Sequence, residues 1–192
     1  ELEAQLLAKG KTEILAAMNA ELATAGEMSF TRQMQPKGLG HAVWCARDII
    51  GHEPFAVILP DVIVDSQPGA LKQLAEVYAQ VGGNVIGVEA VPAADTHKYG
   101  IIDPASHDGR RYGMKGMIEK PAQGTAPSNM SISGRYILQP EIFDLLETQE
   151  RGAGGEIQLT DAMDRLMKTQ VFTAYEYEGV THDCGDKIGL LR

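Results

Sequence analysis

The order of apolar and polar residues along the chain predicts buried strands separated by amphipathic helices. Residues 55–59 form a continuous apolar run between two prolines, which is typical of a strand covered on both faces. Residues 71–81 carry apolar side chains at helical spacing and stop at two glycines, so we expect a helix there. A second apolar run, at 85–91, predicts the next strand.

The rest of the chain continues this alternation of strands and helices. The further expected strands span 30–34, 114–118, 131–138 and 172–177, and the further expected helices span 1–24, 41–50, 140–147 and 156–167. Gly10 weakens the first of these helices. Strands that alternate with helices indicate an α/β fold with a mostly parallel central sheet, and a chain of 192 residues fits a single domain over 1–192.

Charge and cysteine content narrow the classes of function. The chain has 17 Lys and Arg against 26 Asp and Glu, a net charge of −9, which argues against a binder of nucleic-acid backbones. A nucleotide substrate is compatible with this charge, because a loop and a metal ion can hold phosphates locally. No apolar run approaches the ~20 residues that span a bilayer, and the first residues do not resemble an export signal. Two isolated cysteines fit a reducing cytoplasm.

Ligands in α/β sheets bind beyond the carboxyl ends of the strands, so the residues that follow each predicted strand are candidates for a site. Asp61 follows the strand 55–59, where a carboxylate can hold magnesium together with substrate phosphates. On position alone, a cap on the turn after Pro60 is the more common role. An aspartyl phosphatase is disfavoured, because it needs two aspartates two residues apart, whereas Asp61 and Asp65 are four apart.

A pair of opposite charges, Glu119 and Lys120, follows the strand 114–118. The carboxylate can accept hydrogen bonds from hydroxyl groups, and the ammonium can pair with a phosphate. An exposed ion pair of little energetic value is the alternative. From the residues alone, the two readings are equally supported.

A polar stretch that contains His182, Asp183 and Cys184 follows the strand 172–177. No GxSxG nucleophile elbow accompanies it, and nearby carboxylates disfavour a thiolate at Cys184. Metal binding by Asp183 is therefore more plausible than a Cys–His dyad, and a tight polar turn is the alternative.

A glycine loop precedes the predicted helix 41–50. It contains Gln33, Lys37 and Gly38, and His41 opens the helix. Glycines before a helix let backbone amides approach a ligand. The loop matches neither GxxxxGK[ST] nor GxGxxG, so by itself it is more often a plain turn, with His41 as a polar first-turn residue.

Eight short motifs occur along the chain, of which KGLGHA and EIQLTDA are the most telling. They span 37–43, 56–62, 99–101, 119–121, 127–129, 134–136, 156–161 and 182–185. In this order and spacing they resemble the bacterial UTP–glucose-1-phosphate uridylyltransferases, also called UDP-glucose pyrophosphorylases, over almost the whole chain.

The resemblance implies a fold, a reaction and roles for particular residues. The fold is a three-layer, nucleotide-binding α/β fold of the sugar-nucleotide transferase type, with a mostly parallel central sheet. The reaction joins UTP and glucose 1-phosphate with Mg²⁺ as cofactor and gives UDP-glucose and pyrophosphate, in an enzyme that forms dimers or tetramers. By position, Asp61 and Asp183 are implied as magnesium ligands and, with Lys120, as catalytic residues. Gln33 and Gly38 are implied as contacts of the uracil, His41 as a further substrate-binding residue, Gly100 and Glu119 as contacts of the glucose hydroxyls, and Lys120 as the contact of the sugar phosphate.

One departure concerns the glycine-rich N-terminal loop with which the family wraps the triphosphate. No such loop occurs in 1–192, and the match stops short of the family's C-terminal helix. We therefore expect an internal portion of a longer enzyme, with a fold that is incomplete at the N-terminus, poorly soluble and inactive by itself. Asp186, where relatives often carry Asn, is a minor change. The alternatives are a related sugar-1-phosphate nucleotidylyltransferase that uses dTTP or CTP, and a non-catalytic sugar-nucleotide-binding fragment.

Overall fold

The computed structural model describes residues 2–20 and 23–185, which divide into two compact units, Glu1–Thr31 and Arg32–Arg192. In the first unit, α1 (Leu2–Ala8) and α2 (Thr12–Ala20) are separated by a turn at Gly10. Its φ of 68° is a left-handed conformation that glycine adopts readily, so the predicted first helix is two helices. That residues 1–192 form a single domain stays a prediction, and Asp186 lies outside the described residues.

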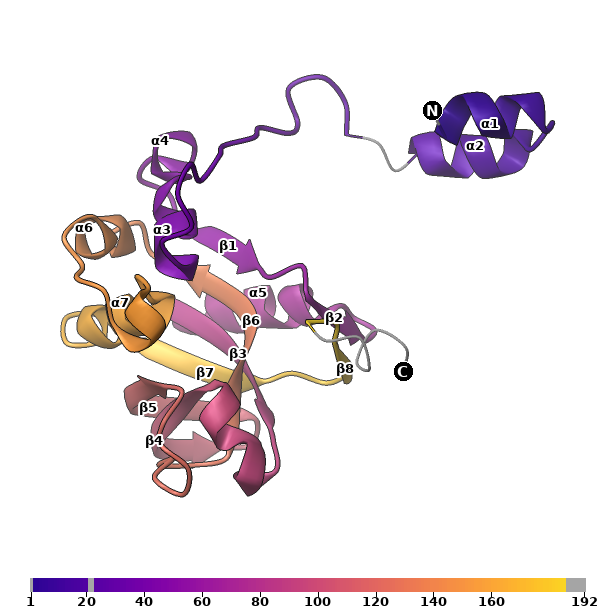
Figure 1. The fold of residues 1–192 in the computed structure, drawn as a ribbon. Coiled ribbons are helices and arrows are strands. Elements are labelled where there is room, and N and C mark those ends of the chain that lie inside the picture. The colour runs from indigo at the N-terminus through magenta and orange to yellow at the C-terminus, as the bar shows by residue number, and fades with distance from the viewer. Residues whose placement is uncertain (1, 21–22, 186–192) are drawn as a thin grey trace. The chain divides into compact units, whose positions relative to one another are not determined.

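The second unit contains a six-stranded sheet and a separate two-stranded sheet (Figure 1). The large sheet has the order β1-β6-β3-β7-β5-β4, and the small one pairs β2 with β8. The strands are β1 (Phe55–Ile58), β2 (Val62–Asp65), β3 (Asn84–Ala90), β4 (Gly100–Asp108), β5 (Arg111–Glu119), β6 (Met130–Leu138), β7 (Phe172–Glu176) and β8 (Val180–Asp183).

The directions of the strands correct one sequence-based prediction. Among the pairings of the described residues in the large sheet, β3 with β7 is parallel, and β1–β6, β3–β6, β4–β5, β4–β6 and β5–β7 are antiparallel. The prediction of a mostly parallel sheet is therefore wrong for this part of the chain. One cause is the unpredicted strand β4, which joins β5 through the two residues Gly109 and Arg110, a connection that only antiparallel strands can use.

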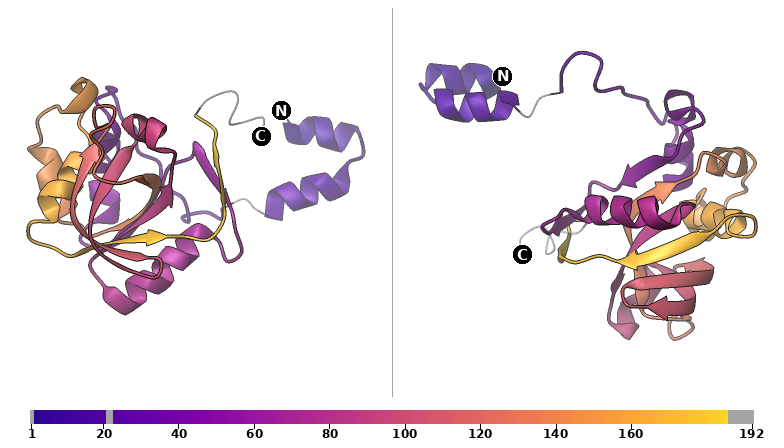
Figure 2. Two further views of the ribbon diagram at one scale, coloured as in Figure 1. Left: turned by 90° about the horizontal axis from the view of Figure 1, so that it is seen from below. Right: turned by 180° about the vertical axis from the view of Figure 1, so that it is seen from behind.

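Helices cover both faces of the large sheet, which confirms the predicted three-layer α/β arrangement within this unit (Figures 1 and 2). On one face, α3 (Leu39–Trp44), α6 (Ile142–Glu147) and α7 (Leu159–Leu166) pack over the main core through Val43, Leu146 and Met163. On the other face, α5 (Ala70–Val81) buries Leu74 and Val77 against β3 and β6.

Short helices connect the remaining segments. They are α4 (Arg47–Ile50), η1 (Ala93–Lys98) and η2 (Ala153–Gly155). The predicted helix 41–50 is divided into α3 and α4, and the predicted strand 30–34 does not form. No helix within 2–20 and 23–185 is long and apolar enough to cross a lipid bilayer.

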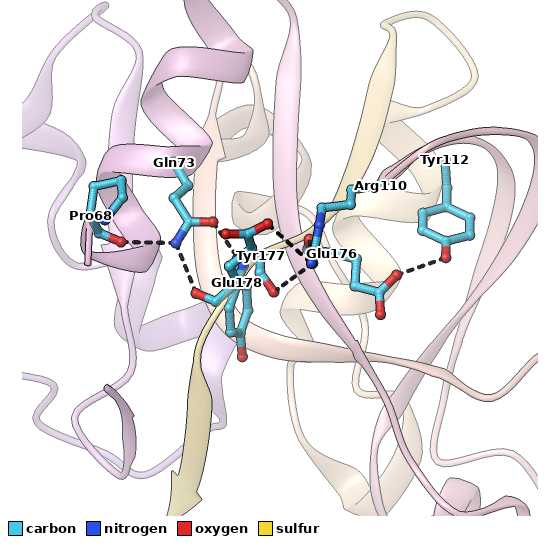
Figure 3. A network of polar contacts seen from close by, with 7 residues as sticks. All are labelled: Pro68, Gln73, Arg110, Tyr112, Glu176, Tyr177 and Glu178. Carbon is cyan, nitrogen blue, oxygen red and sulfur yellow. Dashed lines mark hydrogen bonds and ion pairs between the residues drawn. The ribbon is translucent and has the colours of Figure 1, made fainter. Parts of the chain in front are cut away.

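A polar network fixes the chain as it leaves β7 for β8 (Figure 3). The amide of Gln73, on α5, donates to the carbonyl oxygens of Pro68 and Glu178, each at 2.8 Å, and accepts from the Glu178 N–H at 2.8 Å. Arg110 donates to the carbonyl oxygen of Glu176 at 3.1 Å and forms an ion pair with Glu178 at 3.1 Å. These contacts set the path of the segment that continues to Asp183.

Candidate functional site

A cavity of about 620 Å³ lies where several strands of the second unit end or begin. Its wall includes the segment after β1, the ends of β3 and β5, the beginning of β4, the middle of β6, the first turn of α7 and the strand β8. This size lies within the range of small-molecule sites. The charged residues that line it are Asp61, Glu89, Lys98, Glu119, Lys120 and Asp183.

The two predicted metal-binding carboxylates meet at one end of the cavity. The backbone N–H of Cys184 donates to the carbonyl oxygen of Asp61 at 2.7 Å, which brings the residue after β8 against the turn after β1. A methyl group placed on Gly185 would lie 3.0 Å from Asp183 Oδ1 and 3.8 Å from Asp61 Oδ2. Both carboxylates therefore border the same small space, although 122 residues separate them along the chain.

Glu119 is held at another part of the wall by Thr160, at the start of α7. The Thr160 hydroxyl donates to Glu119 Oε2 at 2.7 Å, and the Glu119 side chain is 14% exposed. A Cβ at Gly100 would lie 3.1 Å from Glu119 Oε2 and 3.3 Å from Thr160 Oγ1, so the absence of a side chain there leaves room for this pair. Oε1, the other carboxylate oxygen, is left to accept from a ligand.

Lys120, directly after β5, has an unusual backbone conformation. Its φ of 45° is left-handed, which costs a non-glycine residue of the order of 1–3 kcal/mol. The Lys120 N–H donates to the carbonyl oxygen of Tyr99 at 3.0 Å, and Pro121 follows. The ammonium lies 4.0 Å from Glu119 Oε1 and is half exposed. The Glu119 carboxylate, which can accept hydrogen bonds from hydroxyl groups, and the Lys120 ammonium thus lie next to each other at the cavity wall.

Four carboxylates and two lysines line the cavity, so its own charge is unfavourable for phosphates. Burial raises the pKa of Glu89, and Asp183 raises it further, whereas a hydrogen bond from Thr181 opposes the shift. Burial also raises the pKa of Tyr136, and Glu119 and Asp61 add to this effect. A phosphate ligand in this cavity requires additional positive charge.

The donor set at the carboxylate end fits a hard divalent cation. Asp61 and Asp183 offer oxygen ligands, and a cation such as Mg²⁺ commonly takes one or two carboxylates and completes its shell with water and substrate phosphates. Within 2–20 and 23–185, no group of three or more His, Cys, Asp or Glu side chains forms a ready-made metal site. The arrangement is therefore suited to a metal that arrives with, or is completed by, a phosphate ligand.

The glycine loop forms a second group beside this cavity. Gln33 Nε2 donates to the carbonyl oxygen of Gly38 at 3.0 Å and lies 2.9 Å from His41 Nδ1. A donor can face Nδ1 only when His41 is neutral and carries its proton on Nε2. Burial lowers the pKa of His41, and Lys37 lowers it further, which favours that neutral form. Leu39, between Gly38 and α3, lines the cavity.

Gly38 is required by the packing of this loop. Its φ is 110°, and a Cβ there would lie 2.7 Å from the Cβ of Glu156 and 2.8 Å from the carbonyl oxygen of Ile157. Ile157 pairs with the loop through its backbone, since its N–H donates to Lys37 and its carbonyl oxygen accepts from Gly40. The KGLGHA and EIQLTDA motifs are thus in direct contact.

Comparison with known proteins agrees with this geometry. Residues 6–190 match the profile of a family described as nucleotidyl transferase. The chain belongs to the nucleotidyl transferase family. It is 51% identical, over its whole length, to the UTP–glucose-1-phosphate uridylyltransferase of Bacillus subtilis (strain 168), of which it spans 65%. The resemblance stated from the sequence is therefore confirmed.

Solved structures of similar proteins show the same fold. A UTP-bound UGPase from Acinetobacter baumannii matches with a TM-score of 0.83 and 41% identity, over 99% of this chain and 66% of that one. A UDP-glucose pyrophosphorylase complexed with UDP-glucose matches with a TM-score of 0.81 and 40% identity, over 84% of this chain and 62% of that one. The α/β fold of the sugar-nucleotide transferase type is confirmed by these matches.

The structure gathers the sequence-predicted site residues into two groups. Asp61, Gly100, Glu119, Lys120 and Asp183 line the cavity, whereas Gln33, Gly38 and His41 form the cluster in the glycine loop.

The polar residues of the cavity wall that were not predicted from the sequence include Thr160, Glu89 and Lys98. Glu89 lies at the carboxyl end of β3, so the strand-end rule could have found it. Thr160 belongs to EIQLTDA, but its contact with Glu119 depends on the folded sheet.

Proposed function

We propose that this protein transfers the uridylyl group of UTP to glucose 1-phosphate, forming UDP-glucose and pyrophosphate. The observation that carries the proposal is that one cavity holds two carboxylates that border the same small space, together with the Glu119–Lys120 pair. The similarity to proteins named for this activity, and to structures with UTP and UDP-glucose bound, supports it.

In the proposed reaction, a phosphate oxygen of glucose 1-phosphate attacks the α-phosphorus of UTP. A new P–O bond forms as the bond from the α-phosphorus to the bridging oxygen of the leaving pyrophosphate breaks. Such a substitution depends on alignment and on neutralisation of charge more than on an acid or base. This requirement agrees with a site whose wall offers charged side chains.

Each end of the cavity has a proposed task. Glu119 Oε1 accepts hydrogen bonds from glucose hydroxyls, the backbone of Gly100 contacts the same hydroxyls, and Lys120 pairs with the phosphate of glucose 1-phosphate. Asp61 and Asp183 would hold Mg²⁺, which supplies positive charge to the phosphates when bound.

The nucleotide base is assigned to the glycine loop. Because Gln33 Nε2 contacts Gly38 and His41, Gln33 Oε1 is the side-chain atom that would accept from uracil N3–H. Cytosine lacks this N–H, so the contact favours UTP over CTP. We further propose that the protein acts in the cytoplasm, as a homodimer or homotetramer, without nucleic-acid or membrane partners.

The experiment that tests the proposal is pyrophosphate release by the full-length protein, with UTP, glucose 1-phosphate and Mg²⁺ supplied together and each omitted in turn. Lys120→Ala should raise the KM for glucose 1-phosphate at least ~10-fold, because a phosphate loses its counter-charge. Lys115→Ala is the matched control, since Lys115 lies on the same strand and pairs with Asp103 outside the cavity. No release with all three components present, or equal effects of the two variants, would count against the assignment.

A further inference from the structure

Arg135, on β6, is a buried cation that is held by backbone carbonyl groups. Its side chain is 8% exposed, and within the described ranges no carboxylate lies within ion-pair distance of it. Its Nη1 donates to the carbonyl oxygens of Leu59 at 3.1 Å and Gly134 at 3.3 Å, and its Nη2 donates to that of Val62. Burying a charge costs free energy unless the N–H groups of the guanidinium donate to acceptors.

The carbonyl groups that Arg135 holds lie on both sides of Asp61. Leu59 is two residues before it and Val62 is the next residue, so the guanidinium bridges the turn that carries the Asp61 carboxylate. The Leu59 N–H also donates to the carbonyl oxygen of Gly134 at 2.9 Å. Hydrogen bonds with residues of β6 therefore hold the turn between β1 and β2 in place.

The absence of a side chain at Gly134 makes these hydrogen bonds sterically possible. Its φ is 73°, and a Cβ placed there would lie 3.0 Å from the Leu59 side chain. The backbone of β6 thus comes close enough to Leu59 for Arg135 to reach across the turn. The carbonyl group of Asp61 itself accepts from the N–H of Cys184, which is next to Asp183.

We infer that Arg135 is a positioning residue, which fixes the Asp61 turn and, through the Asp61–Cys184 contact, the spacing of the two cavity carboxylates. Arg135 does not line the cavity, so it acts on the site through the turn and touches no ligand. A lysine has a single ammonium and cannot donate to Leu59 and Val62 in the fixed fork geometry of a guanidinium. The role therefore depends on the shape of the group and not only on its charge. The catalytic consequence rests on the proposed uridylyl transfer, whereas the structural consequence does not.

The test compares Arg135→Lys, which keeps the charge, with Arg135→Gln, which keeps one donor group. Both are made in the full-length protein. Arg110→Lys is the control, because Arg110 also donates to a backbone carbonyl group but does so in the network of Figure 3, outside the cavity.

The first readout is amide hydrogen exchange without metal or nucleotide. In both Arg135 variants the N–H groups of Leu59 and Cys184 should exchange at least ~10-fold faster than in the unmodified protein, whereas the amides of β3 should keep their rates. In Arg110→Lys, all amides of the turn between β1 and β2 should keep their rates. Unchanged exchange at Leu59 and Cys184 would overturn the inference. This result decides the positioning role even if the protein forms no UDP-glucose.

The second readout is activity as a function of Mg²⁺ concentration. Both Arg135 variants should require at least ~10-fold more Mg²⁺ for half-maximal rate, with the KM for glucose 1-phosphate within about twofold of the original. Full activity in Arg135→Lys with a loss in Arg135→Gln would mean that charge alone matters and would overturn the role of the fork. If one Arg135 variant does not fold, the other still tests the inference, because either substitution removes the simultaneous contact with Leu59 and Val62.

Discussion

Removal of the Thr160 hydroxyl by Thr160→Val should weaken the use of glucose 1-phosphate without unfolding the protein. The substitution keeps the shape of the side chain and deletes the 2.7 Å hydrogen bond to Glu119 Oε2. A hydrogen bond to a charged group contributes about 1.5–3 kcal/mol. Because the Glu119 side chain is 14% exposed and water from the cavity can replace the hydroxyl in part, we expect the lower part of this range, about 1.5–2 kcal/mol.

That energy corresponds to a decrease of about 10- to 30-fold in kcat/KM for glucose 1-phosphate, since every 1.4 kcal/mol is a factor of ten. The assay is pyrophosphate release at saturating UTP and Mg²⁺, with glucose 1-phosphate varied. The control is Thr169→Val, which removes a hydroxyl that donates to Leu166 away from the cavity. A change of less than twofold in Thr160→Val, or an equal decrease of kcat/KM for UTP and for glucose 1-phosphate, would refute the reasoning.

Three further predictions concern the carboxylate end and the glycine loop. Asp61→Asn should lower kcat at least ~100-fold, the scale of a lost electrostatic contact, whereas Asp65→Asn, outside the cavity, should change it less than about threefold. Gln33→Ala should reduce the ratio of kcat/KM for UTP to that for CTP by at least ~10-fold, whereas the exposed Gln35→Ala should not. Burial lowers the pKa of His41, so below about pH 6.5 the unfolded chain takes up a proton at this residue more readily than the native protein. Tm should therefore fall as the pH is lowered from about 7.5 to about 5.5, and it should fall less in His41→Gln.

Local patterns were sufficient for the elements with strong periodicity. The helix at 71–81 and the strands at 55–59, 85–91 and 131–138 are found in the structure within one or two residues. The helix and the strands β3 and β6 bury regular sets of apolar side chains. The expectation that 55–59 is covered on both faces is wrong, because β1 lies at the edge of the sheet and alternates half-buried with exposed residues, with Ile58 53% exposed. The strand 100–108 was missed, since its second half is polar and exposed and its pairing with β5 is visible only once the hairpin has formed.

In the candidate site, too, residues marked by a local sequence pattern could be predicted, whereas contacts between distant parts of the chain could not. Asp61 and Glu119 could be proposed from the sequence because each follows an apolar strand, where α/β sheets bind ligands. Thr160 is 41 residues from Glu119, and no local pattern indicates their hydrogen bond. The bridge from Arg135 to Val62, 73 residues away, likewise depends on how β6 lies beside β1.

The central claim is that the cavity joins a uridylyl group to glucose 1-phosphate. The most direct measurement is a competition in which the full-length protein receives equal concentrations of UTP, dTTP and CTP with glucose 1-phosphate and Mg²⁺, and the sugar nucleotides are separated and identified by mass. We expect UDP-glucose as the main product, with one pyrophosphate released for each molecule formed. Predominant formation of dTDP-glucose or CDP-glucose, or consumption of UTP without any sugar nucleotide, would contradict it.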